Sequence, residues 1–465
     1  MEKKYIEGII SYAQSQAEKI EYNNTIFEIM EGDLLKYVGE TLSRQLSANN
    51  AVIAMERAAP INIWNKIVKK LSKLYVAGVK RTTENPADQE LIEYYEKKGL
   101  NRHFGNLNEN YNAFKWSSLE IFEDEEIKSL RFRAVPSNQF LAYSDDPVDP
   151  LRITAIIKFM GIHNDAMGVK RQKFWIYTAD EFVATLDNAE LVLEDMEANQ
   201  GINPYGVIPF QYASMSEYIL VPNPDLDTKQ MTCLIPVLIT DQNFGSLFLS
   251  LPIIYAVDAG LENLPVSPNM FVNLKSDSED GKQAQIGVVK AEPNLEAQMN
   301  HVKNQLAMWL ESKDIKPGTV GGNMTAENFS SGISKIISEM DTLENRKMQE
   351  EVFQDVETKF WKRLAVMHNE LAKVGRLETR KVFSDPLALE VTVEYAEEQI
   401  IESRSDLVQR LKEERNAGFM STKKAIQTLN PKMDEGVIED LMQEIDDEGV
   451  SIVVEDNNGP TEDND

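Results

Sequence analysis

The feature that most constrains the fold is a long stripe of apolar residues in the last third of the chain. Between Ile333 and Leu371, apolar side chains recur in steps of three and four residues, with one step of five. Such steps place side chains on one face of an α-helix. At about 1.5 Å per residue, roughly 40 residues would form a helix about 60 Å long. Gly375 follows as a typical helix stop, so the sequence predicts one very long amphipathic helix.

The first quarter of the chain also shows helical spacing. The pattern covers residues 1 to about 125, and it is clearest over residues 61–81 and from Asn108 to about Glu126. The polar face of residues 61–81 is basic. It is interpreted as a solvated helix face, with a surface facing an acidic neighbour as the alternative. Its residues are Lys66, Lys69, Lys70, Lys73, Lys80 and Arg81.

A β-rich region follows. Its expected strands are rich in Val, Ile, Phe and Tyr and are bounded by Pro and Asp clusters. They are Arg131–Tyr143, Arg152–Phe159 and Lys170–Tyr177, then a short helix or strand at Ala179–Leu186 and a turn-bounded strand at Asn203–Phe210.

Two more helices are expected in the middle of the chain. Asp227 to about Leu251 is mostly apolar, with Pro236 as a weak point or kink, and Leu295 to about Ser312 forms the second. Short β-type runs lie between them at Met270–Leu274 and Gln285–Val289.

After the long helix, the pattern predicts a strand at Leu387–Tyr395 and a compact helical segment from Glu397 to about Glu448. Every charged side chain from Asp434 onward is acidic, and the last residues are expected to be disordered. The fold class expected for the whole chain is α+β, mainly helical.

Hydrophobic content, cysteine count and net charge limit the classes of function that the chain can have. Hydrophobic residues make up 42% of the chain, which is enough to fold, and no stretch approaches the ~18 apolar residues of a membrane span. The N-terminus lacks the apolar core of a signal peptide, which argues against secretion. The single Cys233 rules out a disulfide framework within one chain. A net charge of -28 argues against tight nucleic-acid binding but is compatible with a channel through which DNA slides.

None of the sequence motifs that could form a catalytic, nucleotide-binding or metal-binding site fits the pattern that such a site requires. The loop GTVGGN is not preceded by a strand or closed by Lys-Ser/Thr, so it does not fit a P-loop. Asp145, Asp146 and Asp149 are better explained by a turn between strands than by a cation site, and Ser330 and Ser331 by helix capping. The histidines are not paired at ligand spacing, so no enzyme, metal or cofactor is expected. They are His103, His163, His301 and His368.

The order of these parts resembles the portal proteins of tailed bacteriophages. The likeness covers most of residues 50–448 and rests on several segments in the order of that family. They are INIWNKIVKKLSKLYVAGVKR, RAVPSNQFLAYSD, YTADEF, NPYGVIPF, SSGISKIISEMDTLENRK and NAGFMSTKKAIQTLNPKMDEGVIEDLMQEI.

The resemblance implies a portal-type fold with wing, stem, clip and crown. It implies assembly into a cyclic ring, expected to be a dodecamer, at one vertex of the capsid in the virion, after synthesis in the host bacterial cytoplasm. The implied parts are an N-terminal helical part of the wing (1–127), a β-rich wing (128–226), a first stem helix (227–251), a clip (252–293), a second stem helix (294–315), a tunnel loop (316–331), a long helix and wing strand (332–396), a helical crown (397–448) and an acidic disordered tail (449–465).

The implied partners are double-stranded DNA passing without sequence specificity, the terminase large subunit, head-completion or adaptor proteins, and the major capsid or scaffolding protein. No membrane contact is implied. The tunnel loop would lie nearest the DNA, with glycines that allow it to bend. Its candidate residues are Lys316, Thr319, Gly321, Gly322, Asn323 and Asn328. The alternative is an acidic, helical cytoplasmic adaptor or scaffold protein that does not contact DNA.

Overall fold

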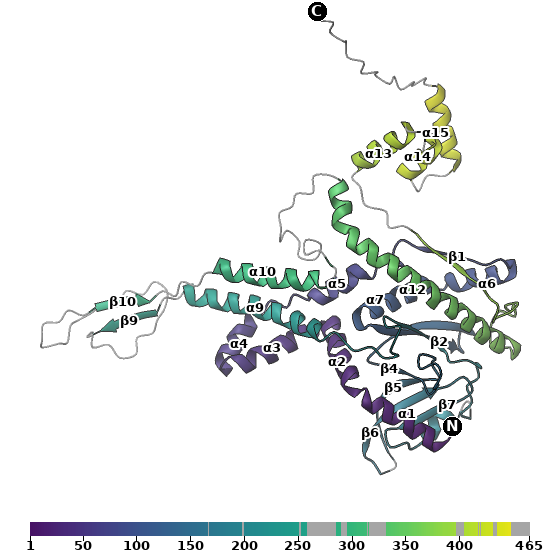
Figure 1. Ribbon diagram of the computed structural model, residues 1–465, viewed down its shortest axis with the longest axis horizontal. Coiled ribbons are helices and arrows are strands. Elements are labelled where there is room, and N and C mark those ends of the chain that lie inside the picture. Colours follow the sequence, from purple (N-terminus) through teal and green to yellow (C-terminus); the bar gives the residue numbers. More distant parts are fainter. Residues whose placement is uncertain are drawn as a thin grey trace, which may run out of the picture. The chain divides into compact units, whose positions relative to one another are not determined.

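The computed structural model describes residues 1–165, 167–197, 200–250, 253–257, 285–289, 295–313, 315, 332–396, 404–416, 418, 420–430 and 435–447. They belong to two compact units. The first comprises residues 1–327 and 338–398, and the second comprises residues 328–337 and 399–465. Helix predominates over strand among the described residues, and the mixed, mainly helical composition agrees with the sequence prediction (Figure 1).

The helices are distributed along the whole chain. In order they are α1 (Lys3–Ser15), α2 (Ala17–Glu28), the π-helix η1 (Ile29–Asp33), α3 (Leu34–Gln45), α4 (Ala48–Glu56), α5 (Ile63–Leu71), α6 (Pro86–Glu96), α7 (Leu100–Phe114), α8 (Leu193–Met196), α9 (Leu226–Ser250), α10 (Leu295–Glu311), α12 (Gly332–Lys373), α13 (Arg404–Asn416), α14 (Thr422–Leu429) and α15 (Glu435–Asp447).

Among the described residues, the strands form four antiparallel sheets, with the orders β3-β2-β8, β4-β5-β6-β7, β1-β11 and β10-β9. They are β1 (Val79–Thr82), β2 (Trp116–Asp124), β3 (Ser129–Pro136), β4 (Phe140–Tyr143), β5 (Ala155–Asn164), β6 (Lys170–Tyr177), β7 (Phe182–Leu186), β8 (Phe210–Ser214), β9 (Ile253–Val257), β10 (Gln285–Val289) and β11 (Thr392–Tyr395).

The largest core of the first unit lies where α12 packs against α6, α7 and the β3-β2-β8 sheet. Aromatic rings join these elements. Phe104 of α7 meets Phe360 of α12 edge-on, with ring centroids 5.0 Å apart, and Tyr111 meets Phe353 at 5.3 Å. Rings of this size bury much apolar surface, so these contacts stabilise the packing of the long helix against α7.

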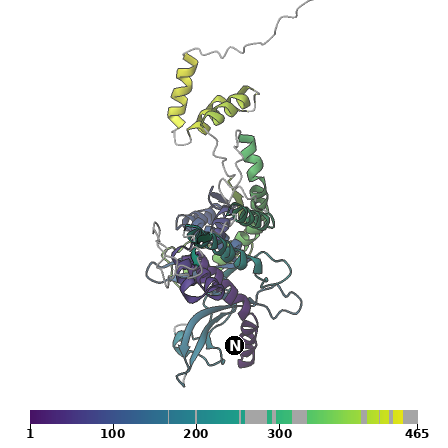
Figure 2. The same ribbon diagram turned by 90° about the vertical axis from the view of Figure 1, so that its left-hand side faces the viewer.

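A second core lies between α1 and the four-stranded β4-β5-β6-β7 sheet. Ile6, Ile9 and Ile10 of α1 are buried there. Figures 1 and 2 both show α1 running alongside the strands of this sheet. The aspartates predicted to form a turn do so between β4 and β5, where Asp146 accepts hydrogen bonds from the backbone N–H of Val148 and Asp149.

The second unit contains α13, α14 and α15, which confirms the helices expected there. Ser421 caps α14, and its hydroxyl accepts a hydrogen bond from the backbone N–H of Lys424. Leu411, Ala425 and Ile438 are buried between the three helices.

The long helical predictions are confirmed. The helices α9, α10 and α12 match the expected ranges to within a few residues, and Pro236 lies inside α9. The expected stop after α12 is also present, since Gly375 has a left-handed backbone with φ of 72°. Strand β10 coincides with the run at Gln285–Val289, whereas Met270–Leu274 lies outside the described residues.

The predicted helix from Asn108 to Glu126 is wrong. Helix α7 ends at Phe114, Lys115 takes a left-handed conformation with φ of 70°, and β2 begins at Trp116. The first six residues of β2 are all buried, because the strand is central in its sheet. A strand covered on both faces lacks the alternation that identifies strands in a sequence.

The basic helix over residues 61–81 is also too long. Helix α5 ends at Leu71, Gly78 has a φ of 100°, and the chain continues into β1. Arg81 is therefore not part of a solvated face, since its side chain is fully buried.

Two shorter strand predictions need adjustment, and one open alternative is settled. Of the short helix or strand expected over residues 179–186, the strand is confirmed, as β7. The segment Asn203–Phe210 forms turns held by the Asn203 side chain, which donates to the carbonyls of Thr178 and Val207, and β8 begins only at Phe210. Strand β11 begins only at Thr392.

Candidate functional site

The six predicted channel residues, Lys316, Thr319, Gly321, Gly322, Asn323 and Asn328, lie outside the described residues, as do Ser330 and Ser331. The structure instead describes the two flanks of residues 316–331. These flanks are the end of α10 with the residues just after it, and the long helix α12.

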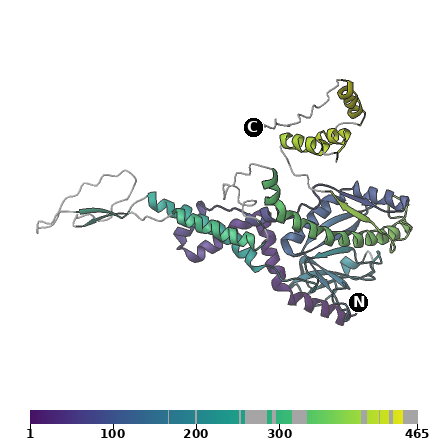
Figure 3. The same ribbon diagram turned by 45° about the horizontal axis from the view of Figure 1, so that its top comes forward.

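Helices α9 and α10 lie side by side, as Figures 1 and 3 both show. Chain order places β9 and β10 between them, and these two strands pair antiparallel, with Ile253 opposite Val289. The bases of the two helices pack onto α2, α5 and α7 through a shared apolar core. Trp64 of α5 and Trp309 of α10 meet in this core, with ring centroids 6.3 Å apart.

The upstream flank of residues 316–331 is anchored by charge and by burial. The Nζ atom of Lys313 lies 3.1 Å from a carboxylate oxygen of Asp225 and 3.1 Å from one of Asp227. The indole N–H of Trp309 donates to Asp227 at 2.9 Å. Ile315 is buried and its backbone N–H donates to the carbonyl of Leu310. The chain therefore leaves α10 from a fixed position.

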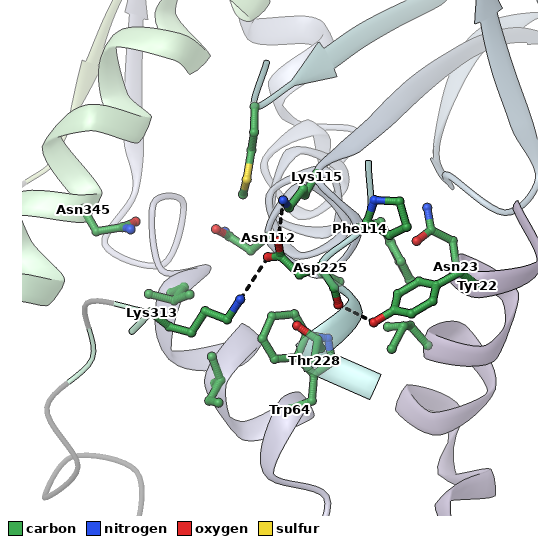
Figure 4. A pocket seen from close by; sticks show the side chains of 16 residues that line it. Tyr22, Asn23, Trp64, Asn112, Phe114, Lys115, Asp225, Thr228, Lys313 and Asn345 are labelled. Atoms are coloured by element: carbon green, nitrogen blue, oxygen red, sulfur yellow. Dashed lines mark hydrogen bonds and ion pairs between the residues drawn. The ribbon is translucent and has the colours of Figure 1, made fainter. Parts of the chain in front are cut away.

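Asp225 is the centre of this anchor. The Nζ atom of Lys115, the residue that ends α7, lies 2.6 Å from a carboxylate oxygen of Asp225. The backbone carbonyl of Asp225 accepts a hydrogen bond from the Tyr22 hydroxyl. Figure 4 shows Lys115 and Lys313 reaching the same carboxylate from two sides. Burial raises the pKa of Asp225, but the hydrogen bonds from both lysines lower it further, so the net shift is downward.

The downstream flank is held by an amide network between α7 and α12. The Gln349 side chain donates to Asn112 at 3.0 Å and to Asn345, and it accepts from Asn108 at 2.7 Å. Asn108, Asn112 and Gln349 are all buried. These buried amide contacts favour one packing arrangement of α12 on α7, and the Oδ1 atom of Asn108 is left without a hydrogen-bond partner among the described residues.

Both flanks thus attach to the C-terminal half of α7. Lys115 holds the upstream flank and Asn112 holds the downstream flank. A cavity of about 140 Å³ lies between them and is lined by both Lys313 and Asn345. Its other lining residues are Tyr22, Asn23, Ile26, Trp64, Ile67, Leu71, Asn112, Ala113, Phe114, Lys115, Met215, Pro224, Asp225 and Thr228.

A buried ion pair fixes α12 further along its length. Arg81 of β1 donates from Nε and Nη2 to the two carboxylate oxygens of Glu357, at 2.5 and 3.0 Å. Both side chains are fully buried. Arg81 also bonds Glu96 and Asn101 through Nη1, at 2.9 and 2.6 Å, while the Tyr75 hydroxyl donates to Glu357.

Nothing in the sequence pattern alone identified these anchors. Asp225 and Lys115 are 110 residues apart (225 − 115), and Arg81 and Glu357 are 276 apart.

The histidines are dispersed, as expected. His163 and His301 are exposed and His103 is partly buried. His368 is buried between two partners: its Nδ1 lies 2.6 Å from the Tyr95 hydroxyl, and its Nε2 lies 2.7 Å from the Lys381 carbonyl. Within the described residues, no group of three or more His, Cys, Asp or Glu side chains is placed to hold a metal ion.

Similarity to known proteins does not assign the chain to a family. It matches no protein-family model, and no curated protein is significantly similar to it in sequence. Across the described helices, none combines the length and apolar character required to cross a bilayer.

Proposed function

We propose that this chain is a ring-forming portal subunit of a tailed bacteriophage. In this role it would form the channel through which double-stranded DNA enters and leaves the capsid, without sequence specificity and without catalysis. The observation that carries the proposal is the sequence of elements around residues 316–331. Two paired helices joined through an antiparallel strand pair are followed by a segment of 20 residues (312–331) and then by a helix of 42 residues.

The anchors of both flanks support the proposal. A segment that borders moving DNA has to be held at its ends while it remains free of tight phosphate contacts. Lys313 and Ile315 hold one end, and Gln349 holds the helix that follows the other end. Asp225 and Asp227 neutralise the positive charge of Lys313, so we expect this lysine to make no tight contact with a DNA phosphate.

The proposed assembly is a cyclic ring, with a dodecamer as the expected form, located at the portal vertex of the virion. The expected partners are the terminase large subunit, head-completion or adaptor proteins, and the major capsid or scaffolding protein. A ring built from one chain needs two different, complementary faces on each subunit. The long helices supply elongated surfaces of the kind that such contacts require.

The test is the assembly state of the purified full-length chain. Mass photometry at micromolar concentration and negative-stain microscopy should show closed rings with a central channel. A stable monomer with no rings under these conditions would contradict the portal proposal. It would favour the acidic adaptor or scaffold instead.

A further inference from the structure

The hairpin of β5 and β6 extends beyond the sheet to which it belongs. Strand β4 pairs with β5 only as far as Lys158, and β7 pairs with β6 only from Lys173 onward. Residues 161–165 and 167–171 lie past both points and pair only within the hairpin, and we call them the arm. Figures 1 and 2 both show the end of this hairpin projecting beyond the neighbouring strands.

The arm presents apolar side chains to solvent on a fixed backbone. Ile162, Met167 and Val169 are 72%, 91% and 50% exposed. The Asp165 carboxylate accepts hydrogen bonds from the backbone N–H groups of Met167 and Val169, at 2.9 and 2.8 Å. It also accepts one from Nε of Arg171 at 2.6 Å. A preorganised projection has little conformational freedom left to lose on binding, so the arm is suited to docking.

A groove of about 400 Å³ lies at the base of the same hairpin. Phe159 of β5 and Phe174 of β6 contribute two rings, with centroids 5.7 Å apart. Ala13 of α1 and Ile20 of α2 add further apolar surface to the lining. Pockets of this size with apolar and aromatic walls are typical binding sites, so the groove can accept apolar side chains.

The charges of the arm and the groove are complementary. The described residues that line the groove include Glu21 and Asp187 and no basic side chain. Asp187 is paired with Arg171 at 3.2 Å, whereas the exposed Glu21 carboxylate has no partner among the described residues. On the arm, Asp165 is paired with Arg171, and the exposed Lys170 likewise has no partner in the described part of the chain. The groove therefore offers a negative charge and the arm a positive one.

The arm cannot enter the groove of its own chain. The hairpin that carries Phe159 and Phe174 into the groove continues directly into the arm, and its pairing runs on to Asn164 opposite Lys170. Folding back would break this pairing, so an arm in the groove has to come from a second copy. Copies with a net charge of -28 repel one another, and a contact between them is favoured where opposite charges meet.

We propose that the arm of one copy docks in the groove of the next copy of this chain. Met167 would lie against the rings of Phe159 and Phe174, and Lys170 would pair with Glu21. The two surfaces differ, so the contact is heterologous and each copy uses its arm on one neighbour and its groove on the other. The inference rests on the proposed ring assembly, for which it names one subunit contact.

The test compares the assembly of full-length variants by mass photometry over a series of protein concentrations. Met167→Asp buries a charge in the apolar groove and should raise the concentration needed for half-assembly about tenfold or more. Val148→Asp is the matched control, because Val148 is 90% exposed and lies between β4 and β5, outside the arm. We expect it to assemble as the wild type does. A melting curve of each variant establishes that it is folded.

A charge exchange tests whether the arm meets this particular groove. Glu21→Lys and Lys170→Glu each bring like charges together and should each weaken assembly about two- to fivefold. The double variant Glu21→Lys/Lys170→Glu restores an opposite pair and should assemble close to the wild-type concentration. These variants keep the proposal testable if Met167→Asp fails to fold.

Selective loss of assembly in Met167→Asp, together with recovery in the double variant, supports the contact. Rings that form equally well in Met167→Asp and in both single charge variants would overturn it and leave the portal proposal intact. Equal losses in Met167→Asp and Val148→Asp, or a double variant no better than the single ones, would overturn it as well. A wild type that stays monomeric would overturn both proposals.

Discussion

Replacing Arg81 by methionine should destabilise the first unit strongly, because it leaves a buried carboxylate without its counter-charge. Glu357 has no exposed side-chain surface, and Arg81 supplies both of its charged hydrogen bonds. Removing one partner of a buried ion pair costs about 3–5 kcal/mol. The Tyr75 hydroxyl stays as a neutral donor to Glu357, so we expect a loss near the lower end of this range.

The double variant Arg81→Met/Glu357→Met removes both charges, so it distinguishes the cost of an unpaired buried carboxylate from the cost of losing the ion pair itself. Replacing both charges by apolar side chains of similar size is often neutral or stabilising. The double variant should therefore be more stable than Arg81→Met alone, although Glu96 and Asn101 lose their contacts with Arg81. The double-mutant cycle should give a coupling free energy of about 2–3 kcal/mol, at the upper end of the range for residues in contact.

The assay is urea unfolding followed by tryptophan fluorescence. All of the tryptophans lie in the first unit, so the signal reports on that unit alone. Lys359→Met is the control on the same helix, since Lys359 pairs with Asp355 at 2.6 Å while both side chains are 61% exposed. Exposed helix pairs contribute only about 0.3–0.5 kcal/mol. A loss below about 1 kcal/mol for Arg81→Met would refute the argument.

Three further predictions follow from the same contacts and from the proposed channel. Burial lowers the pKa of His368 below its usual value, so its contribution to stability is complete above about pH 6.5 and declines as the pH falls, by at most ~1.4 kcal/mol per pH unit. Urea unfolding at pH 7 and pH 5 should show this loss in the wild type and a smaller one in His368→Gln. Gly375→Ala should cost about 1 kcal/mol in the same assay, because φ is 72° there and no atom lies within 4 Å of the added methyl group; an unchanged stability would contradict this. In assembled heads, Gly321→Val/Gly322→Val should form rings but fail to package DNA, and Asn323→Lys should bind DNA more tightly with a steeper salt dependence. Wild-type packaging rates together with unchanged DNA titrations at two salt concentrations would show that these residues do not face the channel.

The long helices could be predicted from the sequence because their apolar periodicity extends over many turns. For α12 the pattern covers about ten turns, and its expected end at Gly375 matches the left-handed backbone there. Short helices leave less room for such a signal. Helix α5 has only 9 residues, and the basic residues that follow it continued the apparent pattern into β1.

Strand β2 and the anchors could not be predicted for a different reason. The first six residues of β2 are buried on both faces, so the sequence Trp-Ser-Ser-Leu-Glu-Ile shows no alternation. The charges at the anchors depend on partners far away in the chain. Arg81 had the appearance of one more surface cation beside Lys80, and only the fold brings Glu357 to it.

The C-terminal half of α7 connects the two helices that flank residues 316–331, and this suggests how the proposed channel segment would respond to load. A force on that segment would act at Lys313 on one side and along α12 on the other. Lys313 is tied through Asp225 to Lys115, and α12 is tied through Gln349 to Asn112, three residues earlier in the chain. The two forces would therefore meet within one turn at the end of one helix. A shift of the first flank would break the partly exposed ion pairs of Asp225 with Lys115 and Lys313, and a shift of the second would break the buried amide contact between Asn112 and Gln349. Because buried amide contacts are costly to break, we expect the part of α12 that carries Gln349 to keep its place against α7 under such a force.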